Sequence, residues 1–198
     1  MSGKKLFLTV ISGFLATISL PLFASSSIPD GWYLEGLVGS THLSNKSYPG
    51  SSSTSGAGGN INLGYKFMPF FSAEFGYTQY ANTTIKDQFG TKAATDKHRT
   101  YDIAAKGIVP ISTSGFEVFA KLGLQRTTSK VSTEDPTAAS NIGITNTSHS
   151  DTSLYLGAGA QYYFIPELAG VLQWARAQNN SNTGTLDLYS AGLSFIFG

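Results

Sequence analysis

The chain has 198 residues, no cysteine, and 13 lysine and arginine side chains against 12 aspartate and glutamate side chains. The lack of cysteine excludes disulfide bonds and thiolate metal sites. A net charge near zero gives no reason to expect a nucleic acid or another strongly charged partner.

The N-terminal residues have the pattern of a secretory signal peptide. Residues 1–5 carry two lysines, residues 6–22 are mostly apolar, and Ala24 is a small residue at a suitable cleavage point. We expect residues 1–24 to be the signal peptide and residues 25–198 to form the mature domain. The alternative is an uncleaved membrane anchor, although the apolar stretch is near the lower length limit for a spanning helix.

After the signal, eight segments alternate apolar residues with small or polar ones. This period of two predicts strands with one apolar face. In chain order the segments are residues 31–41, 57–67, 71–80, 100–109, 116–127, 152–164, 168–175 and 189–198. We find no convincing helical stretch and no further run of 18 apolar residues, so any membrane crossing must be made by strands. An even number of segments near ten residues predicts an all-β fold, an eight-stranded antiparallel up-and-down transmembrane β-barrel.

The connections between these segments alternate between short and long. The short ones are residues 68–70, 110–115 and 165–167. The long ones are rich in Ser, Thr, Asn and Gly, and cover residues 42–56, 81–99, 128–151 and 176–184. Short periplasmic turns and long outer loops are the expected asymmetry of an outer-membrane barrel.

The charged residues indicate which face of the strands meets lipid. Lys106 and Lys121 lie several residues from the nearest turn and so at some depth in the membrane. A lysine that faced lipid near the midplane would cost about 2 to 4 kcal/mol. The apolar faces therefore point outward, and the charged faces point into the lumen. The predicted lumenal charges are Glu35, Glu74, Asp102, Lys106, Glu117 and Lys121.

Aromatic residues gather where the strands meet the short turns, although ordinary core packing would explain any one of them. Such a girdle is typical of the membrane interface. The predicted interface residues are Trp32, Phe67, Phe71, Phe116, Phe164, Phe195 and Phe197.

Several stretches resemble successive strands of a known family. They are GWYLEGLVGS, FFSAEFGY, AAKGIVPISTSGFEVFAKLG, YLGAGAQYYFIPELAGVLQW and the ending GLSFIFG. In order and spacing they look like the OmpA-like transmembrane domain and the wider outer-membrane β-barrel family, over nearly all of the mature chain. The resemblance implies a surface or envelope protein in the outer membrane of a Gram-negative cell. Because the chain stops at Gly198, we expect no peptidoglycan-binding domain.

Family members carry an ionic network inside the barrel, and the resemblance places Glu74, Lys106 and Lys121 at matching positions. Two positions depart from the family: Gln161 replaces an acidic residue, and Val171 replaces an arginine. Our hypothesis is that Glu74 pairs with Lys106 or Lys121. The alternative is a set of scattered lumenal charges that meet only water.

The sequence shows no catalytic, cofactor-binding or metal-binding constellation. The three histidines, His42, His98 and His149, fall in or beside predicted outer loops, where we expect them to be solvated. His42 and Ser44 have the spacing used by outer-membrane lipid A deacylases, but no acidic segment of that kind lies beside them.

We therefore expect a non-enzymatic barrel with no cofactor, whose long loops bind a host or extracellular ligand. The other expected partners are outer-membrane lipid and lipopolysaccharide, and the barrel-assembly machinery through the C-terminal strand. An eight-stranded barrel is only wide enough for its own side chains. The alternatives are a small pore, a lipid-modifying enzyme, and a soluble exported barrel that holds an apolar ligand.

Overall fold

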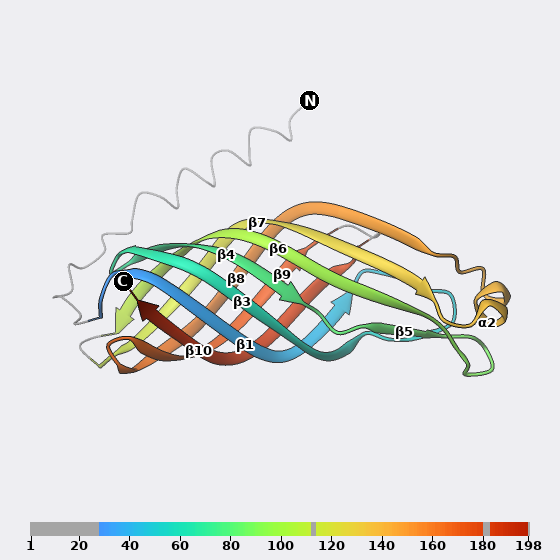
Figure 1. The fold of residues 1–198 in the computed structure, drawn as a ribbon, viewed down its shortest axis with the longest axis horizontal. Helices are drawn as coiled ribbons and strands as arrows, with labels where there is room; N and C mark the ends of the chain where they lie inside the picture. Colours follow the sequence, from blue (N-terminus) through green and yellow to red (C-terminus); the bar gives the residue numbers. More distant parts are fainter. Residues whose placement is uncertain (1–27, 112–113, 180–182, 198) are drawn as a thin grey trace, which may run out of the picture.

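Eight long antiparallel strands form a closed ring in the computed structural model, which describes residues 28–111, 114–179 and 183–197 (Figure 1). The ring strands are β1 (Gly31–Ser44), β3 (Ser55–Met68), β4 (Phe71–Gln79), β6 (Lys92–Ile111), β7 (Phe116–Thr133), β8 (Thr147–Ile165), β9 (Leu168–Gln178) and β10 (Thr185–Phe197). The predicted signal peptide, residues 1–24, lies outside the described residues.

Each ring strand pairs with its neighbours in the chain order, and β1 pairs with both β3 and β10, which closes the ring. Every pairing is antiparallel. The predicted eight-stranded antiparallel barrel is thus confirmed. Short turns join the strands at one end, which we call the turn end, and it also carries both ends of the barrel domain (Figure 1).

Side chains along the ring strands alternate between the outside and the lumen. On β6, for example, Ile103 is 64% exposed, whereas the preceding residue, Asp102, is buried. The outward apolar band on this strand runs from Ile111 to Tyr101. The ten steps between these two residues, at about 3.4 Å each and tilted by about 40°, give the band a height of about 26 Å.

Three strands continue well beyond this apolar band, and here the structure corrects the sequence prediction. Residues 81–99 and 128–151 were predicted to be loops. Instead β6 begins at Lys92, β7 ends at Thr133 and β8 begins at Thr147. We use the name distal region for these strand ends, residues 92–99, 128–133 and 147–153, together with the loops and short elements that pack beside them. These strand ends have no apolar face, so a search for apolar alternation does not detect them.

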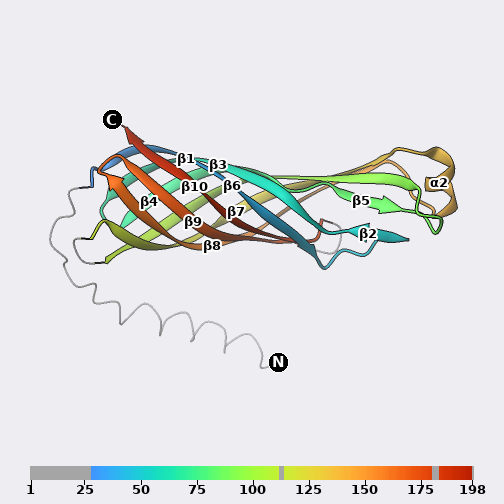
Figure 2. The same cartoon turned by 90° about the horizontal axis from the view of Figure 1, so that it is seen from below.

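The distal region contains three more short elements: β2 (Ser51–Ser53), β5 (Thr83–Lys86) and α2 (Pro136–Asn141). They extend the sheet and cover its far end (Figure 2). Helix α2 was not predicted from the sequence. It starts at an Asp-Pro pair, where the Asp135 carboxylate accepts hydrogen bonds from the backbone N–H groups of Thr137 and Ala138.

Two small apolar cores hold the distal region together. In the first, Ile85 of β5 packs with Ala94 of β6 and Val131 of β7. In the second, the alanines of α2 pack on Ala93. The distal region is therefore a packed structure rather than a set of free loops.

Candidate functional site

Two lysines and two glutamates form one ionic cluster inside the lumen. The Nζ atom of Lys121 lies 2.7 Å from Glu74 Oε2 and 3.2 Å from Glu35 Oε1. The Nζ atom of Lys106 lies 3.4 Å from Glu74 Oε1 and 3.6 Å from Glu35 Oε2. Both hypothesised pairs, Glu74 with Lys106 and Glu74 with Lys121, are present, and Glu35 joins them.

A second pair is connected to this cluster. Lys66 Nζ lies 3.6 Å from Glu117 Oε1. The Gln161 side chain links the two groups, because its Nε2 donates to Glu117 and its Oε1 accepts from Lys106. Gln161, at the position where the family has an acidic residue, is thus a neutral side chain that connects Glu117 to Lys106 by hydrogen bonds.

Neutral side chains complete the hydrogen bonding of the cluster. The hydroxyl of Tyr33 donates to Glu74 at 2.6 Å, and the amide of Asn62 donates to Glu35 at 2.7 Å. The ring of Phe119 lies 4.2 Å from Lys106 Nζ, within cation–π range. Three carboxylates and three ammonium groups are therefore held together where water is scarce.

Two residues near the network do not join it. The Asp102 carboxylate is buried in the lumen, and neither of its oxygens has a hydrogen-bond partner within the described residues. Val171, where the family has an arginine, packs instead with Leu37, Ile108 and Phe119 in an apolar cluster.

Sequence reasoning did not name Lys66, Tyr33 and Asn62 as members of the network, and it named Gln161 only as a departure from the family pattern. Tyr33 could have been found, because it alternates in step with Glu35, which was already assigned to the lumen. Lys66 and Asn62 share the polar face of their strand, and the charge argument places that face inward. The ion pairs themselves could not be predicted, because they join side chains of different strands across the lumen.

The predicted aromatic residues all lie on the outside of the ring at the turn end, and all are exposed. They are Trp32, Phe67, Phe71, Phe116, Phe164, Phe195 and Phe197. Several are in contact, as in the chain from Trp32 through Tyr65 to Phe67. A second group, which includes Tyr77 and Tyr101 with ring centroids 5.1 Å apart, lies at the other edge of the apolar band.

A buried polar cluster ties the first distal loop, residues 45–50, to the sheet. The Asp96 carboxylate accepts from Lys46 Nζ at 2.6 Å, from the Tyr48 hydroxyl at 2.8 Å and from the Ser129 hydroxyl at 2.8 Å. Burial alone raises the pKa of Asp96, but His98, Lys46 and the hydrogen bonds from Lys46 and Ser129 outweigh it and hold the pKa below its usual value. Asp96 is therefore the ionised centre of this cluster.

His98 lies beside the cluster and is completely buried, which corrects the expectation of a solvated loop histidine. Its Nε2 is 3.5 Å from Asp96 Oδ2, and neither ring nitrogen has a hydrogen-bond partner within the described residues. Burial lowers the pKa of His98 to about 4, although Asp96 opposes this shift. The ring is therefore neutral at pH 7.

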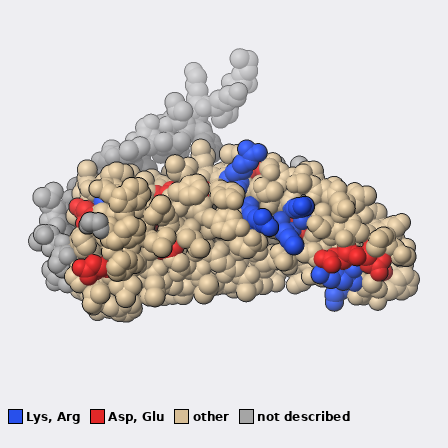
Figure 3. Space-filling model, in the orientation of Figure 1, with Lys and Arg blue, Asp and Glu red and all other residues tan. Residues whose placement is uncertain are grey.

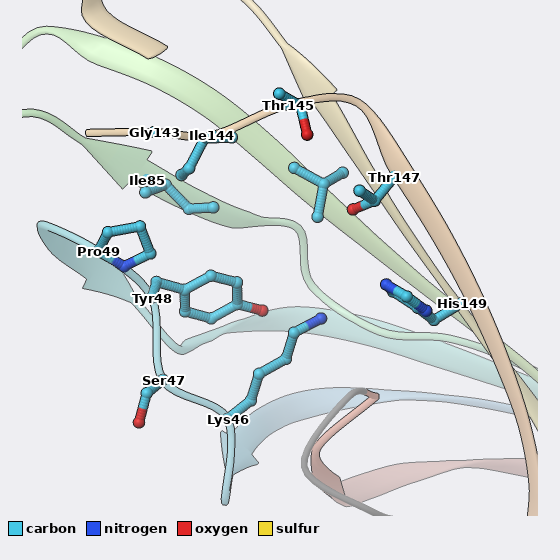
Figure 4. A pocket seen from close by; sticks show the side chains of 11 residues that line it. Lys46, Ser47, Tyr48, Pro49, Ile85, Gly143, Ile144, Thr145, Thr147 and His149 are labelled. Atoms are coloured by element: carbon cyan, nitrogen blue, oxygen red, sulfur yellow. The ribbon is translucent and has the colours of Figure 1, made fainter. Parts of the chain in front are cut away.

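A pocket of about 330 Å³ opens between the first distal loop and β8 (Figure 4). Ile85, Val131 and Ile144 form its apolar part. Lys46, Tyr48, Thr147 and His149 contribute polar atoms, and in Figure 4 the Lys46 and Tyr48 side chains point into the space between the two walls. The pocket can hold a small group with both apolar and hydrogen-bonding surface.

The spacing of His42 and Ser44 does not produce a contact between them. His42 Nδ1 lies 2.9 Å from the Ser55 hydroxyl, while Ser44 donates weakly to the backbone of Thr185. No carboxylate hydrogen-bonds His42 in the described part of the chain. In the same part, no group of three His, Asp or Glu residues is placed to hold a metal ion, and no helix is long and apolar enough to cross a membrane.

The family model of the outer membrane protein beta-barrel domain matches residues 11–197 of the chain. The chain belongs to this outer-membrane β-barrel family. Members are found in the outer membrane of Gram-negative bacteria, and this protein is an outer-membrane protein of that kind. The apolar band of about 26 Å has the height that an outer-membrane barrel presents to lipid.

Solved structures with the same fold support this assignment. OprG of Pseudomonas aeruginosa is 15% identical, with a TM-score of 0.58, and the match covers 88% of this chain and 99% of OprG. Neisserial surface protein A is 19% identical, with a TM-score of 0.56 and coverage of 84% and 97%. Ail of Yersinia pestis is 15% identical, with a TM-score of 0.54 and coverage of 85% and 97%. No curated protein sequence matches the chain.

In an outer-membrane β-barrel the short turns face the periplasm and the longer connections face outward. The distal region is therefore the extracellular part of the molecule. The ionic cluster lies within the membrane-spanning part, whereas the Asp96 cluster and the pocket lie outside it.

We expect Asp96→Asn to loosen the first distal loop without unfolding the barrel. The amide cannot form the ion pair with Lys46, and a hydrogen bond to a charged group contributes about 2 kcal/mol. Limited proteolysis within residues 45–50 should accelerate about 30-fold. Glu134→Gln is the matched control, because its ion pair with Lys92 is about half exposed and contributes little. Equal cleavage of the two variants would contradict the prediction.

Proposed function

We propose that this protein is a non-enzymatic surface barrel whose extracellular distal region binds an external ligand. The observation that carries the proposal is the distal region itself, which has its own apolar cores, a buried ion pair between Lys46 and Asp96, and an open pocket. Loops and extensions on rigid barrels are where binding function resides. The barrel then acts as an anchor.

The proposal also covers the processing and the other partners of the chain. Residues 1–24 direct export and are removed, and the barrel-assembly machinery takes up the chain through its C-terminal strand. Outer-membrane lipid and lipopolysaccharide surround the apolar band. Fold relatives support a surface role: one is named as a Neisserial surface protein, and Ail, the attachment invasion locus protein, was solved in complex with the heparin analogue sucrose octasulfate.

A pore is the less favoured alternative because side chains fill the lumen. The cavity beside Lys66, Lys106 and Tyr163 measures about 10 Å³, which is room for about one water molecule. We expect no conductance steps when the protein is added to a planar lipid bilayer. A lipid-modifying activity has no support beyond the His42–Ser55 contact, and the purified protein should leave lipid A acyl chains intact.

The binding proposal can be tested with cells that display the protein. Cells carrying the wild-type barrel should bind at least one member of a panel of immobilised glycans, heparin among them, and extracellular-matrix proteins. Thr147→Trp fills the pocket and should reduce that binding about tenfold or more, whereas Ser52→Trp, on the exposed strand β2, should not. If wild-type cells bind no better than cells without the protein, the proposal is wrong.

A further inference from the structure

Four basic side chains form a patch on the outside of β6 and β7, immediately beyond the apolar band. The patch consists of Lys97, Arg99, Arg126 and Lys130, all exposed. Figure 3 shows basic side chains gathered near the middle of the face in view, away from the acidic groups at the distal tip. We call these four residues the basic patch.

The register of the two strands brings the four cations close together. Lys97 lies directly opposite Lys130, Arg99 opposite Thr128, and Tyr101 opposite Arg126. Side chains directly opposite are about 5 Å apart at Cβ, and diagonal neighbours about 7 to 8 Å apart. Lys97, Arg99 and Lys130 are therefore mutual neighbours, whereas Arg126 lies four residues from Lys130 along β7, which is about 13 Å. An anionic group must carry more than one phosphate to reach all four cations.

None of the four forms an ion pair within the described residues. Two carboxylates lie nearby, and each has its own cation. Asp96 faces inward and is bonded to Lys46, and Glu134, which interacts only weakly with Lys97, forms its ion pair with Lys92. Like charges directly opposite on a strand pair destabilise the sheet. An external anion bound across Lys97 and Lys130 would remove this repulsion.

The height of the patch fits the headgroups of the outer leaflet. Tyr101 marks the outer edge of the apolar band, and Ile103 and Leu124 below it are exposed to lipid. Arg99 and Lys97 lie two and four residues further along the strand, which is about 5 and 10 Å above the band. Tyrosine at the edge of the band, with lysine and arginine above it, is typical of a membrane interface.

We propose that the basic patch binds the phosphate groups of a phosphorylated glycolipid of the outer leaflet, of the lipid A type. This is a site on the side of the barrel, separate from the ligand pocket at the distal end. It would fix the tilt and height of the barrel in the leaflet. A soluble polyanion is the competing occupant, but the patch lies at headgroup height and faces sideways toward the leaflet.

The test is a titration of the full-length barrel in zwitterionic detergent with fluorescent lipid A, followed by fluorescence anisotropy. The wild type should bind diphosphorylated lipid A more tightly than dephosphorylated lipid A. The variant Lys97→Gln with Lys130→Gln should bind the diphosphorylated form about 25-fold more weakly at low salt, about fivefold for each cation removed. Its affinity for the dephosphorylated form should not change.

The chain provides a matched control. Lys86 and Lys92 also lie opposite each other, but at the distal tip and away from the apolar band. Lys86→Gln with Lys92→Gln changes the net charge equally and should leave binding unchanged. Lys97→Arg with Lys130→Arg keeps the charge and should retain binding. Heat-dependent gel mobility checks that each variant is folded.

Three results would overturn the proposal. The first is a wild type that does not distinguish the two forms of lipid A. The second is equal loss of binding in the test variant and the control variant. The third is a soluble heparin fragment whose binding depends on Lys97 and Lys130 while lipid A binding does not, because this would assign the basic patch to a soluble polyanion.

Discussion

We expect Lys121→Met to lower the free energy of unfolding of the barrel by about 3 to 5 kcal/mol, because it leaves two buried carboxylates without their closest cation. Lys121 is fully buried and contacts Glu74 at 2.7 Å and Glu35 at 3.2 Å. Lys106 contacts the same two groups at 3.4 and 3.6 Å, so Lys106→Met should cost about 3 kcal/mol, at the lower end of this range. The free energy of unfolding of each variant can be measured by urea unfolding in lipid vesicles, with heat-dependent gel mobility as the readout of the folded fraction.

The same argument predicts a rescue. Replacing a complete buried ionic cluster with neutral groups of similar size is often harmless, because the desolvation cost disappears together with the attraction. Glu35→Gln and Glu74→Gln, added to Lys106→Met and Lys121→Met, should therefore recover most of the lost stability. Lys86→Met, at an exposed position on β5, is the control and should change stability by less than about 0.5 kcal/mol. If either single lysine variant were as stable as the wild type, the lumenal charges would not act as a network.

The barrel could be predicted from the sequence because lipid imposes a strict pattern. Each outward position between the turn end and Tyr101 must be apolar or aromatic, so residues such as Leu122, 58% exposed, reveal the period of two. The same reasoning places Lys106 and Lys121 in the lumen. The ring was therefore predictable to within a few residues at its membrane-spanning part.

The distal region was not predictable in this way, since no lipid surrounds it. On β6, Asp96 and His98 face inward while Lys97 and Arg99 face outward, so neither face is apolar. The central contact of the region, between Lys46 and Asp96, joins residues fifty positions apart. Its prediction would require the register of β6 against β7 and the path of the first distal loop, and neither can be obtained from local pattern.

Acidification should destabilise the distal region through His98. Its pKa in the folded protein is about 4, compared with about 6.5 for an ordinary histidine. Between these values the unfolded segment binds a proton that the folded segment does not, so stability is complete above about pH 6.5 and falls as the pH is lowered toward 4. The loss is about 2 kcal/mol at pH 5 and about 3 kcal/mol at pH 4.

The titration of Asp96 does not contribute to the stability change between pH 7.5 and 5. Its pKa in the folded state is lowered, so its stabilising contribution is present above its ordinary value near 3.8 and is lost only at still lower pH. The ammonium group of Lys46 also disfavours a charge on His98 and so acts in the same direction as burial. The change between pH 7.5 and 5 can therefore be assigned to the histidine.

Amide hydrogen exchange of residues 92–99 and 128–133, corrected for its intrinsic pH dependence, measures this effect. Opening of the segment should become about 30-fold more frequent between pH 7.5 and 5, while the membrane-spanning strands stay protected. His98→Gln cannot titrate and should remove the pH dependence, whereas His149→Gln, at an exposed position beside the pocket, should keep it. If the distal region showed no pH dependence, His98 would be solvated rather than buried. The first distal loop lines the pocket and is bonded to Asp96, beside His98, so the same acid range should also weaken ligand binding.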